Sequence, residues 1–254
     1  MRFPKLLLVI CCFYPVLAFA QSDATIEADL LKLFKRIDYW SQNKGYNSDD
    51  SLSAANNVFQ EKIKYYTGKF PSTLTASFSQ LKKARLDIFS SSDKLFRIYS
   101  WDTWTGGTMH QFAGVMQYQT GTVVKSILLT PNDDDGFYSA LYTFKANRKT
   151  YYLVVYNAIY STKDCGAGIQ VIAIENGKLN TNVRLIKTTS GLGSKLYYDY
   201  DFFSILDIPF EKRPTIVFDK KTQTISMPLV NVDGKVTKKF IKYKFTGKYF
   251  ERLK

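Results

Sequence analysis

Cysteine and histidine are almost absent from this chain of 254 residues, which has three cysteines and one histidine. Cys11 and Cys12 lie in an N-terminal segment that resembles a secretory signal, so the exported protein would keep only Cys165. A single cysteine cannot form an internal disulfide, and we therefore expect a hydrophobic core to stabilise the fold. One histidine and one cysteine also cannot supply the usual nitrogen and sulfur ligands of a zinc site.

Cofactor and phosphate-binding motifs are missing as well. The sequence has no P-loop and no dinucleotide-binding glycine pattern after a strand, so we predict no cofactor. The segment 132–136, Asn-Asp-Asp-Asp-Gly, has the oxygen ligands that calcium prefers. Its aspartates are consecutive, whereas an EF-hand loop has ligands at alternate positions. We interpret the segment as an exposed turn between strands and predict no metal site.

Long apolar runs are also missing after the N-terminus, where no stretch approaches the roughly 20 residues of a membrane helix. Arg2 and Lys5 precede an apolar run over residues 6–13, and Ala18-Phe19-Ala20 has the small-x-small pattern of a signal peptidase site. We therefore predict a signal peptide over residues 1–20, cleaved after Ala20. The mature protein is expected to be secreted or periplasmic, and not an integral membrane protein.

Residues 21–86 are predicted to form an N-terminal helical segment. Apolar residues recur three or four apart over residues 26–40, with charged residues between them, which is typical of an amphipathic helix. A second helix is expected over residues 51–66, antiparallel to the first. Pro71 should open a shorter helical turn.

The remaining residues, 87–254, are expected to form a β-rich domain. Their apolar pattern is alternating or continuous, with turn signals about every eight to twelve residues, which favours antiparallel strands over βαβ units. The predicted fold class is α+β, with the helical hairpin packed on a large antiparallel β-meander that is a barrel, a sandwich or an incomplete propeller. The expected strands are 95–104, 109–119, 123–129, 137–145, 151–160, 169–175, 179–186, 196–203, 215–218, 224–230 and 236–245.

Two of these strands have informative patterns. Residues 151–156 are apolar on both faces, so we expect a central strand with the N-terminal helices covering one side. Over residues 238–245 the apolar and basic residues alternate, which predicts a wet face carrying Lys238, Lys242 and Lys244.

The formal charge of +13 is concentrated near the end of the chain, because residues 235–254 contain eight basic residues and one acidic residue. Lysines commonly protect an edge strand from pairing with other chains. The alternative is that Lys238, Lys242 and Lys244 attract an anionic surface. Export argues against a nucleic-acid partner.

Residues 95–118 contain two of the three tryptophans and the only histidine, and they are predicted to form a β-hairpin. Gly106-Gly107 suits a two-residue primed turn. This turn would place Trp101 opposite Phe112 and Thr103 opposite His110. One face would then carry Leu95, Tyr99, Trp101, His110, Phe112, Met116 and Tyr118.

The turn end of this hairpin is the predicted binding site. Binding pockets combine apolar walls with a few polar groups, and both occur together near Gly106-Gly107. Packing of the same aromatic rings in the core is the alternative. The predicted ligand-binding residues are Tyr99, Trp101, Asp102, Trp104 and His110.

Catalytic arrangements are less well supported by the sequence. His110 and Cys165 could form a thiol-based pair only if the fold brought them together, and a structural thiol is the simpler interpretation. Asp199 and Asp201 lie two apart on one face of a strand. Their two carboxylates could serve glycoside hydrolysis, which needs such a pair. We therefore predict an exported envelope or extracellular binding protein for a small molecule, a glycan or a protein. The alternative is a secreted hydrolase that acts on a glycan or peptide through carboxylates.

Overall fold

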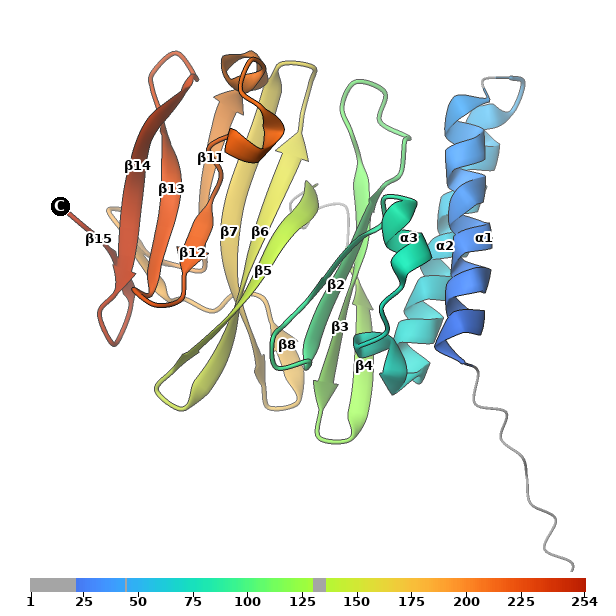
Figure 1. Cartoon of the computed structure of the whole chain (residues 1–254), viewed down its shortest axis with the longest axis horizontal. Helices are drawn as coiled ribbons and strands as arrows, with labels where there is room; N and C mark the ends of the chain where they lie inside the picture. Colours follow the sequence, from blue (N-terminus) through green and yellow to red (C-terminus); the bar gives the residue numbers. More distant parts are fainter. Residues whose placement is uncertain (1–21, 44, 130–135) are drawn as a thin grey trace, which may run out of the picture.

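The computed structural model describes residues 22–43, 45–129 and 136–254, and it arranges them in layers (Figure 1). A pair of helices lies on one side, followed by three stacked β-sheets. The predicted α+β class with helices packed on antiparallel-rich sheets is confirmed, and the described residues form no closed barrel. None of the described helices is long and apolar enough to cross a membrane. The predicted signal peptide lies outside the described residues.

The helical layer contains the two long helices that the apolar pattern predicted. It consists of α1 (Asp23–Gln42), α2 (Ser48–Lys69), the 3-10 turn η1 (Pro71–Leu74) and the short helix α3 (Ser79–Lys83). The hydroxyl of Ser22 caps α1 by accepting a hydrogen bond from the Thr25 amide. Helix α2 begins slightly before residue 51, and its first turn includes Asp49 and Asp50, whose charges are favourable at a helix N-terminus.

The first sheet, here called the helix-side sheet, packs directly against these helices. It contains β1 (Asp87–Ser90), β2 (Phe96–Asp102), β3 (Phe112–Thr120) and β4 (Val123–Leu128), in that order. Strand β2 is buried on both faces. Tyr99 and Trp101 pack with the helices, whereas Phe96 and Ile98 pack with the next sheet.

The middle sheet lies between the other two sheets. It contains β11 (Lys195–Asp201), β7 (Asp164–Glu175), β6 (Lys149–Ile159) and β5 (Gly136–Ala146), with β8 (Lys178–Asn180) paired to β7. The central position predicted for residues 151–156 is confirmed, since they are buried in β6. The expected cover was wrong: one face of β6 packs on the helix-side sheet and the other on the outer sheet, because the helix-side sheet separates β6 from the helices.

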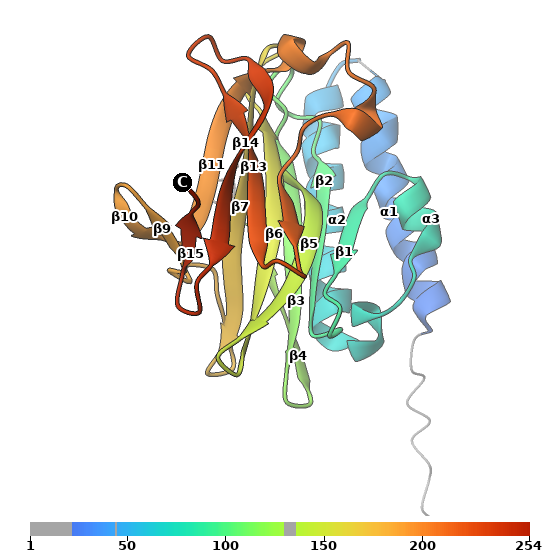
Figure 2. The same ribbon diagram turned by 60° about the vertical axis from the view of Figure 1, so that its left-hand side comes forward.

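The outer sheet completes the stack. Its order is β10 (Gly191–Gly193), β9 (Ile186–Thr188), β15 (Phe250–Arg252), β14 (Val236–Phe245), β13 (Thr224–Val230) and β12 (Val217–Asp219). The 3-10 turns η2 (Phe202–Ile205) and η3 (Phe210–Lys212) connect the middle sheet to it. Strand β15 pairs with β14 in the antiparallel sense and with β9 in the parallel sense, so the sheet is not a pure meander. In Figure 2 the β9–β10 hairpin projects from the edge of this sheet.

The wet face predicted for β14 is confirmed, because Lys238, Lys242 and Lys244 are exposed while Tyr243 and Phe245 are buried. The interpretation of this strand as a sheet edge holds only for its first part. Strand β13 pairs along most of β14, whereas β15 pairs only with residues 243–245, so the part of β14 that carries Lys238 has one neighbouring strand among the described residues. A contact of these lysines with an anionic surface stays a prediction.

The register predicted for the 95–118 hairpin was wrong by one residue. The structure pairs Asp102 with Phe112, Trp101 with Ala113 and Tyr99 with Val115. A shift of one residue moves every side chain to the opposite face of a strand. The predicted shared face therefore does not exist: Tyr99 and Trp101 face the helices, while Met116 and Tyr118 face the middle sheet.

Asp87 in β1 should make stability depend on pH. Burial raises the pKa of its carboxyl to about 6. The folded protein therefore favours the neutral acid, and stability falls as pH rises from about 4 to about 6, where the unfolded chain ionises first. We expect Asp87→Asn to match the parent at pH 4 and to be about 1 to 3 kcal/mol more stable at pH 7.

Urea denaturation at both pH values measures this difference. Asp207→Asn is the matched control, because Asp207 is an exposed loop carboxylate. A gain of stability for Asp87→Asn at pH 4 as large as the gain at pH 7 would contradict the assignment to ionisation.

Candidate functional site

The predicted turn of the hairpin is a longer loop, residues 103–111, which joins β2 to β3. The Thr103 amide closes it by donating to the Gln111 carbonyl at 2.8 Å. Gly107 has a positive φ of 66°. A Cβ on Gly106 would lie 1.7 Å from the Met109 carbonyl oxygen, so the loop requires glycine there. Both glycines thus shape the turn, although they do not form a two-residue loop.

Contacts on two sides hold this loop in place. The side-chain amide of Asn56 on α2 makes two hydrogen bonds. Its Nδ2 donates to the Thr103 carbonyl at 2.9 Å, and its Oδ1 accepts from Trp101 Nε1 at 3.2 Å. On the other side, the His110 amide donates to the Ile159 carbonyl at the end of β6, at 3.1 Å. The loop is therefore fixed to both the helical layer and the middle sheet. Asn56 was not predicted as part of the site, although a polar residue four positions after Leu52 on an apolar helix face is a recognisable signal in the sequence.

Asp102, Trp104 and His110 come together on this loop, and we call them the aromatic ledge. The Trp104 amide donates to Asp102 Oδ1 at 2.8 Å, and the other oxygen of Asp102 contacts His110 Nδ1. The rings of Trp104 and His110 lie 5.6 Å apart at 62°. Trp104 has a positive φ of 58° and is 48% exposed. The indole is therefore held in place while much of its surface stays open to solvent.

The contact with Asp102 also determines what His110 can do. Because Nδ1 faces the carboxylate, Nε2 is the ring atom left to meet a ligand. Both side chains are partly buried. The ledge thus combines an exposed aromatic ring with one oriented polar group.

The five residues predicted to bind a ligand separate into two groups. Tyr99 and Trp101 are 0% and 1% exposed, so in this structure they belong to the core and cannot touch a ligand. Asp102, Trp104 and His110 lie together at the surface, and ligand binding by them stays a prediction. The slip in register explains the division, since it places the aromatic residues of β2 under the helices.

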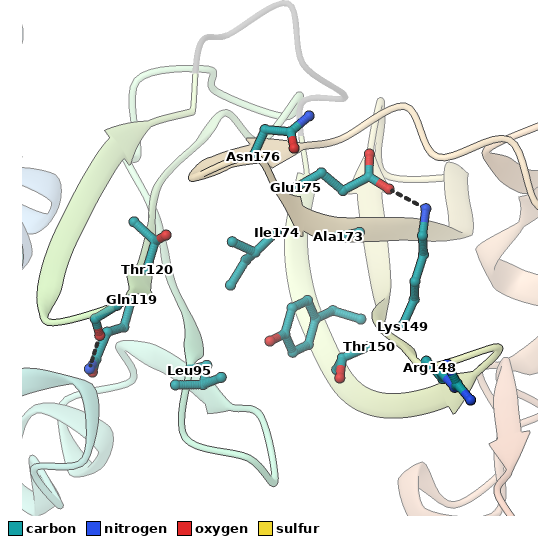
Figure 3. A pocket seen from close by; sticks show the side chains of 12 residues that line it. Leu95, Gln119, Thr120, Arg148, Lys149, Thr150, Ala173, Ile174, Glu175 and Asn176 are labelled. Atoms are coloured by element: carbon teal, nitrogen blue, oxygen red, sulfur yellow. Dashed lines mark hydrogen bonds and ion pairs between the residues drawn. The ribbon is translucent and has the colours of Figure 1, made fainter.

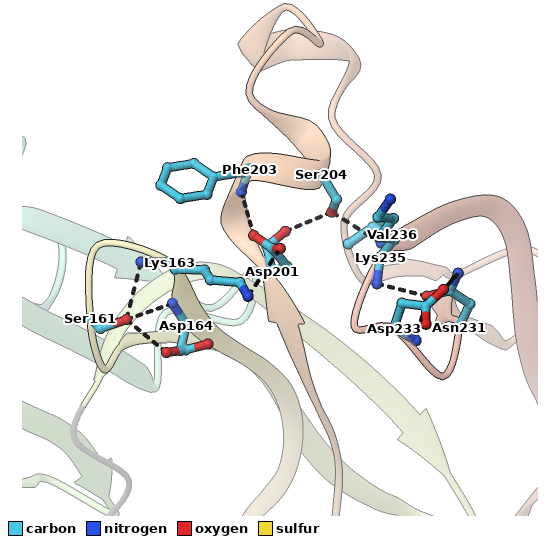
Figure 4. Close-up of polar contacts among 10 residues, drawn as sticks. All are labelled: Ser161, Lys163, Asp164, Asp201, Phe203, Ser204, Asn231, Asp233, Lys235 and Val236. Atoms are coloured by element: carbon cyan, nitrogen blue, oxygen red, sulfur yellow. Dashed lines mark hydrogen bonds and ion pairs between the residues drawn. The ribbon is translucent and has the colours of Figure 1, made fainter.

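A cavity of about 350 Å³ lies at the same end of the middle sheet. Asp164, Asp199, Asp201 and Asp233 line part of it. As predicted, Asp199 and Asp201 share one face of their strand. Figure 4 shows that Asp201 binds the Phe203 amide and pairs with Lys163, at 2.9 and 3.7 Å.

The other aspartates of the cavity also make local contacts. Asp164 accepts a hydrogen bond from Ser161 at 2.8 Å, and Asp199 accepts one from the Tyr197 hydroxyl. Asp233 contacts Asn231 at 3.4 Å within the β13–β14 turn. These carboxylates therefore hold turns and neighbouring side chains in place.

Two tyrosines beside this cavity were not predicted from the sequence as site residues. The hydroxyls of Tyr160 and Tyr197 lie 2.8 Å apart. A Cβ on Gly166 would lie 2.8 Å from each of them, so the glycine gives them room above β7. Burial, together with hydrogen bonds to Asp199 and Tyr160, raises the pKa of Tyr197. The alternating glycines at 166 and 168 in a strand were the available signal, because they mark a close approach to a neighbouring group.

Cys165 is a buried thiol, in agreement with its structural interpretation. It lies on the same face of β7 as Ala167 and Ile169, which belong to the core between the middle and outer sheets. Burial raises the pKa of the thiol and keeps it protonated. His110 belongs to a loop of the helix-side sheet, across the middle sheet, so the two residues do not form a catalytic pair in this structure.

No group of side chains that could hold a metal ion occurs among residues 22–43, 45–129 and 136–254. The aspartates at 133–135 lie outside this part of the chain, so their interpretation as an exposed turn stays a prediction. Comparisons of the chain with protein-family models, curated proteins and solved structures give no match.

Proposed function

We propose that this chain is an exported binding protein and that the aromatic ledge is its ligand-binding surface. The observation that carries this proposal is the conformation of Trp104, a bulky residue with a positive φ whose ring is exposed. A left-handed backbone at a residue other than glycine costs about 1 to 3 kcal/mol, and such residues are concentrated at ligand-binding sites. Because about half of the residue stays exposed, core packing offsets only part of this cost.

The chemistry of the ledge favours a glycan or small molecule with a flat apolar face beside hydroxyl groups. The indole of Trp104 offers the apolar contact, and His110 Nε2 offers a hydrogen bond at its edge. Fixed side chains lose little conformational entropy on binding, which favours affinity. Asp102 contributes by holding His110 and the Trp104 amide.

The alternative function, a secreted hydrolase, would need a carboxylate that is available for proton transfer. Asp164, Asp199 and Asp201 share one cavity, which favours this alternative. Their contacts with Ser161, Tyr197 and Lys163 favour a structural role instead. We therefore prefer the binding function.

Tryptophan fluorescence can test the proposal directly. In a Trp40→Phe background, Trp104 is the exposed tryptophan and Trp101 is buried. A panel of soluble oligosaccharides should include a ligand that shifts the emission. Trp104→Ala should then weaken its binding, measured by calorimetry, roughly 30-fold or more, as expected for a central aromatic contact.

Phe240→Ala is the matched control, since Phe240 is 42% exposed on the distant outer sheet. It should leave binding unchanged. A ligand that binds Trp104→Ala and the parent equally well would place the binding site elsewhere.

A further inference from the structure

A second cavity, of about 600 Å³, lies at the opposite end of the hairpin from the aromatic ledge. Figure 3 shows it between the helix-side sheet, which contributes Leu95 and Gln119, and the middle sheet, which contributes Ile174 and Lys149. We call it the inter-sheet cleft. Its volume is within the range of small-molecule sites, about 300 to 1,000 Å³.

The apolar part of the cleft continues the core between the two sheets. Tyr152 is buried and its ring lies 4.8 Å from that of Phe96, so the floor is closed and rigid. Ile174 packs at the edge of the same core cluster. Leu95 is 39% exposed at the cleft, which leaves an apolar wall in contact with solvent. An apolar group that entered the cleft would cover this wall.

Arg148 gives the cleft a cation that nothing in the described part of the chain neutralises. It follows Asn147 in the tight turn between β5 and β6, and both residues have positive φ values, of 51° and 62°. Such a turn normally favours glycine at the second position. The side-chain Nδ2 of Asn147 fixes the turn by donating to the Gly247 carbonyl at 2.8 Å. The side chain of Arg148 is exposed, lines the cleft and has no ion pair or hydrogen bond with the described residues.

The other charged residues that line the cleft form a pair that can rearrange. Lys149 Nζ lies 3.5 Å from Glu175 Oε1, and Lys149 is largely exposed. Exposed pairs of this kind contribute little to stability. Asn180 donates to the second oxygen of Glu175 at 2.8 Å, so the carboxylate keeps a partner if Lys149 turns away. With Arg148, the lining then has two cations and one carboxylate.

We propose that the inter-sheet cleft binds a small amphipathic anion. The carboxylate or sulfonate of the ligand pairs with Arg148, whose guanidinium fits such groups through two hydrogen bonds, and Lys149 adds a second positive charge. The apolar body of the ligand lies against Leu95, Tyr152 and Ile174. This site is separate from the aromatic ledge and does not depend on the function proposed for it.

The fluorescent anion 8-anilinonaphthalene-1-sulfonate is a suitable probe, with neutral N-phenyl-1-naphthylamine as its uncharged counterpart. Both should bind the full chain saturably. Arg148→Gln should weaken binding of the sulfonate at least roughly tenfold and leave the neutral probe unchanged, because only the charged contact is lost. Glu175→Gln should strengthen sulfonate binding, because it removes the negative charge and releases Lys149.

Filling the cleft tests its position. Ile174→Trp should abolish the binding of both probes, and Leu95→Trp, at an exposed position, repeats the test if the first variant does not fold. Circular dichroism and the melting temperature identify folded variants, since the sulfonate also binds loosened proteins. Lys242→Gln, on the outer sheet, should change nothing. Unchanged sulfonate binding in Arg148→Gln, or in either folded tryptophan variant, would overturn the proposal, as would its loss in Lys242→Gln.

Discussion

Trp101→Ala is expected to lower the free energy of unfolding by about 3 to 5 kcal/mol, the range found when a core tryptophan is removed. Trp101 is 1% exposed, and its ring meets that of Phe59 edge-on with centroids 4.9 Å apart. Its indole N–H also donates to Asn56. The substitution would therefore open a cavity between α2 and the helix-side sheet and remove a donor from a buried amide. Urea denaturation followed by circular dichroism measures the loss.

Trp104→Ala is the matched control, because Trp104 lies only three residues away and is 48% exposed. Its stability should stay within about 0.5 kcal/mol of the parent, as for most surface substitutions. Equal losses in the two variants would mean that Trp104 is also a core residue, and the proposal for the aromatic ledge would fail. An equally small change in both would contradict the burial of Trp101.

Arg97→Ala is expected to cost a similar amount, about 3 to 5 kcal/mol, because it removes hydrogen bonds from buried carbonyls and leaves a cavity where a large buried side chain was. Arg97 is 1% exposed in β2. Its guanidinium donates to the carbonyls of Thr73 and Ala76 at 2.6 and 2.7 Å. It also lies 5.3 Å from the ring centres of Phe78 and Tyr99. The variant would leave two buried carbonyls without these donors and empty the space between the rings.

Arg97→Lys should fall between the parent and Arg97→Ala, because an ammonium keeps the charge but cannot reach both carbonyls in the same planar geometry. Arg252→Ala is the control, since Arg252 is exposed. Melting temperatures and urea midpoints compare the three variants. A stability loss below about 1 kcal/mol for Arg97→Ala would show that the buried contacts do not anchor η1 to the sheet as the geometry indicates.

The elements with long, regular patterns could be predicted from the sequence. The apolar stripe of α1 runs through the whole helix, and β14 alternates between apolar and basic residues over positions 241–245. Strands β1, β10 and β15 were missed. They have only three or four residues, and a period of two cannot be recognised over so short a segment. The order of the sheets depends on packing between distant segments and could not be predicted.

The candidate site was only partly predictable for a related reason. The residue types around Gly106-Gly107 pointed to the surface loop that carries the aromatic ledge. Its length and register depend on the Thr103–Gln111 hydrogen bond and on Asn56 from α2, and a turn motif does not contain this information. The inter-sheet cleft was not predictable at all, because its lining comes from the ends of strands that are far apart in the sequence.

The parallel pairing of β15 with β9 affects the order in which the protein can fold. Lys187 and Glu251 are 64 residues apart in the chain, yet they are neighbours in the outer sheet and their side chains lie 3.3 Å apart. Closing so long a loop has an entropic cost that the consecutive hairpins of the helix-side sheet avoid. The β9–β10 hairpin has no neighbour in the outer sheet until residues 250–252 have been synthesised. During synthesis, the edges of β9 and β14 that β15 later covers therefore wait longer for their partner than the strands of the helix-side sheet, each of which pairs with its neighbour in the sequence.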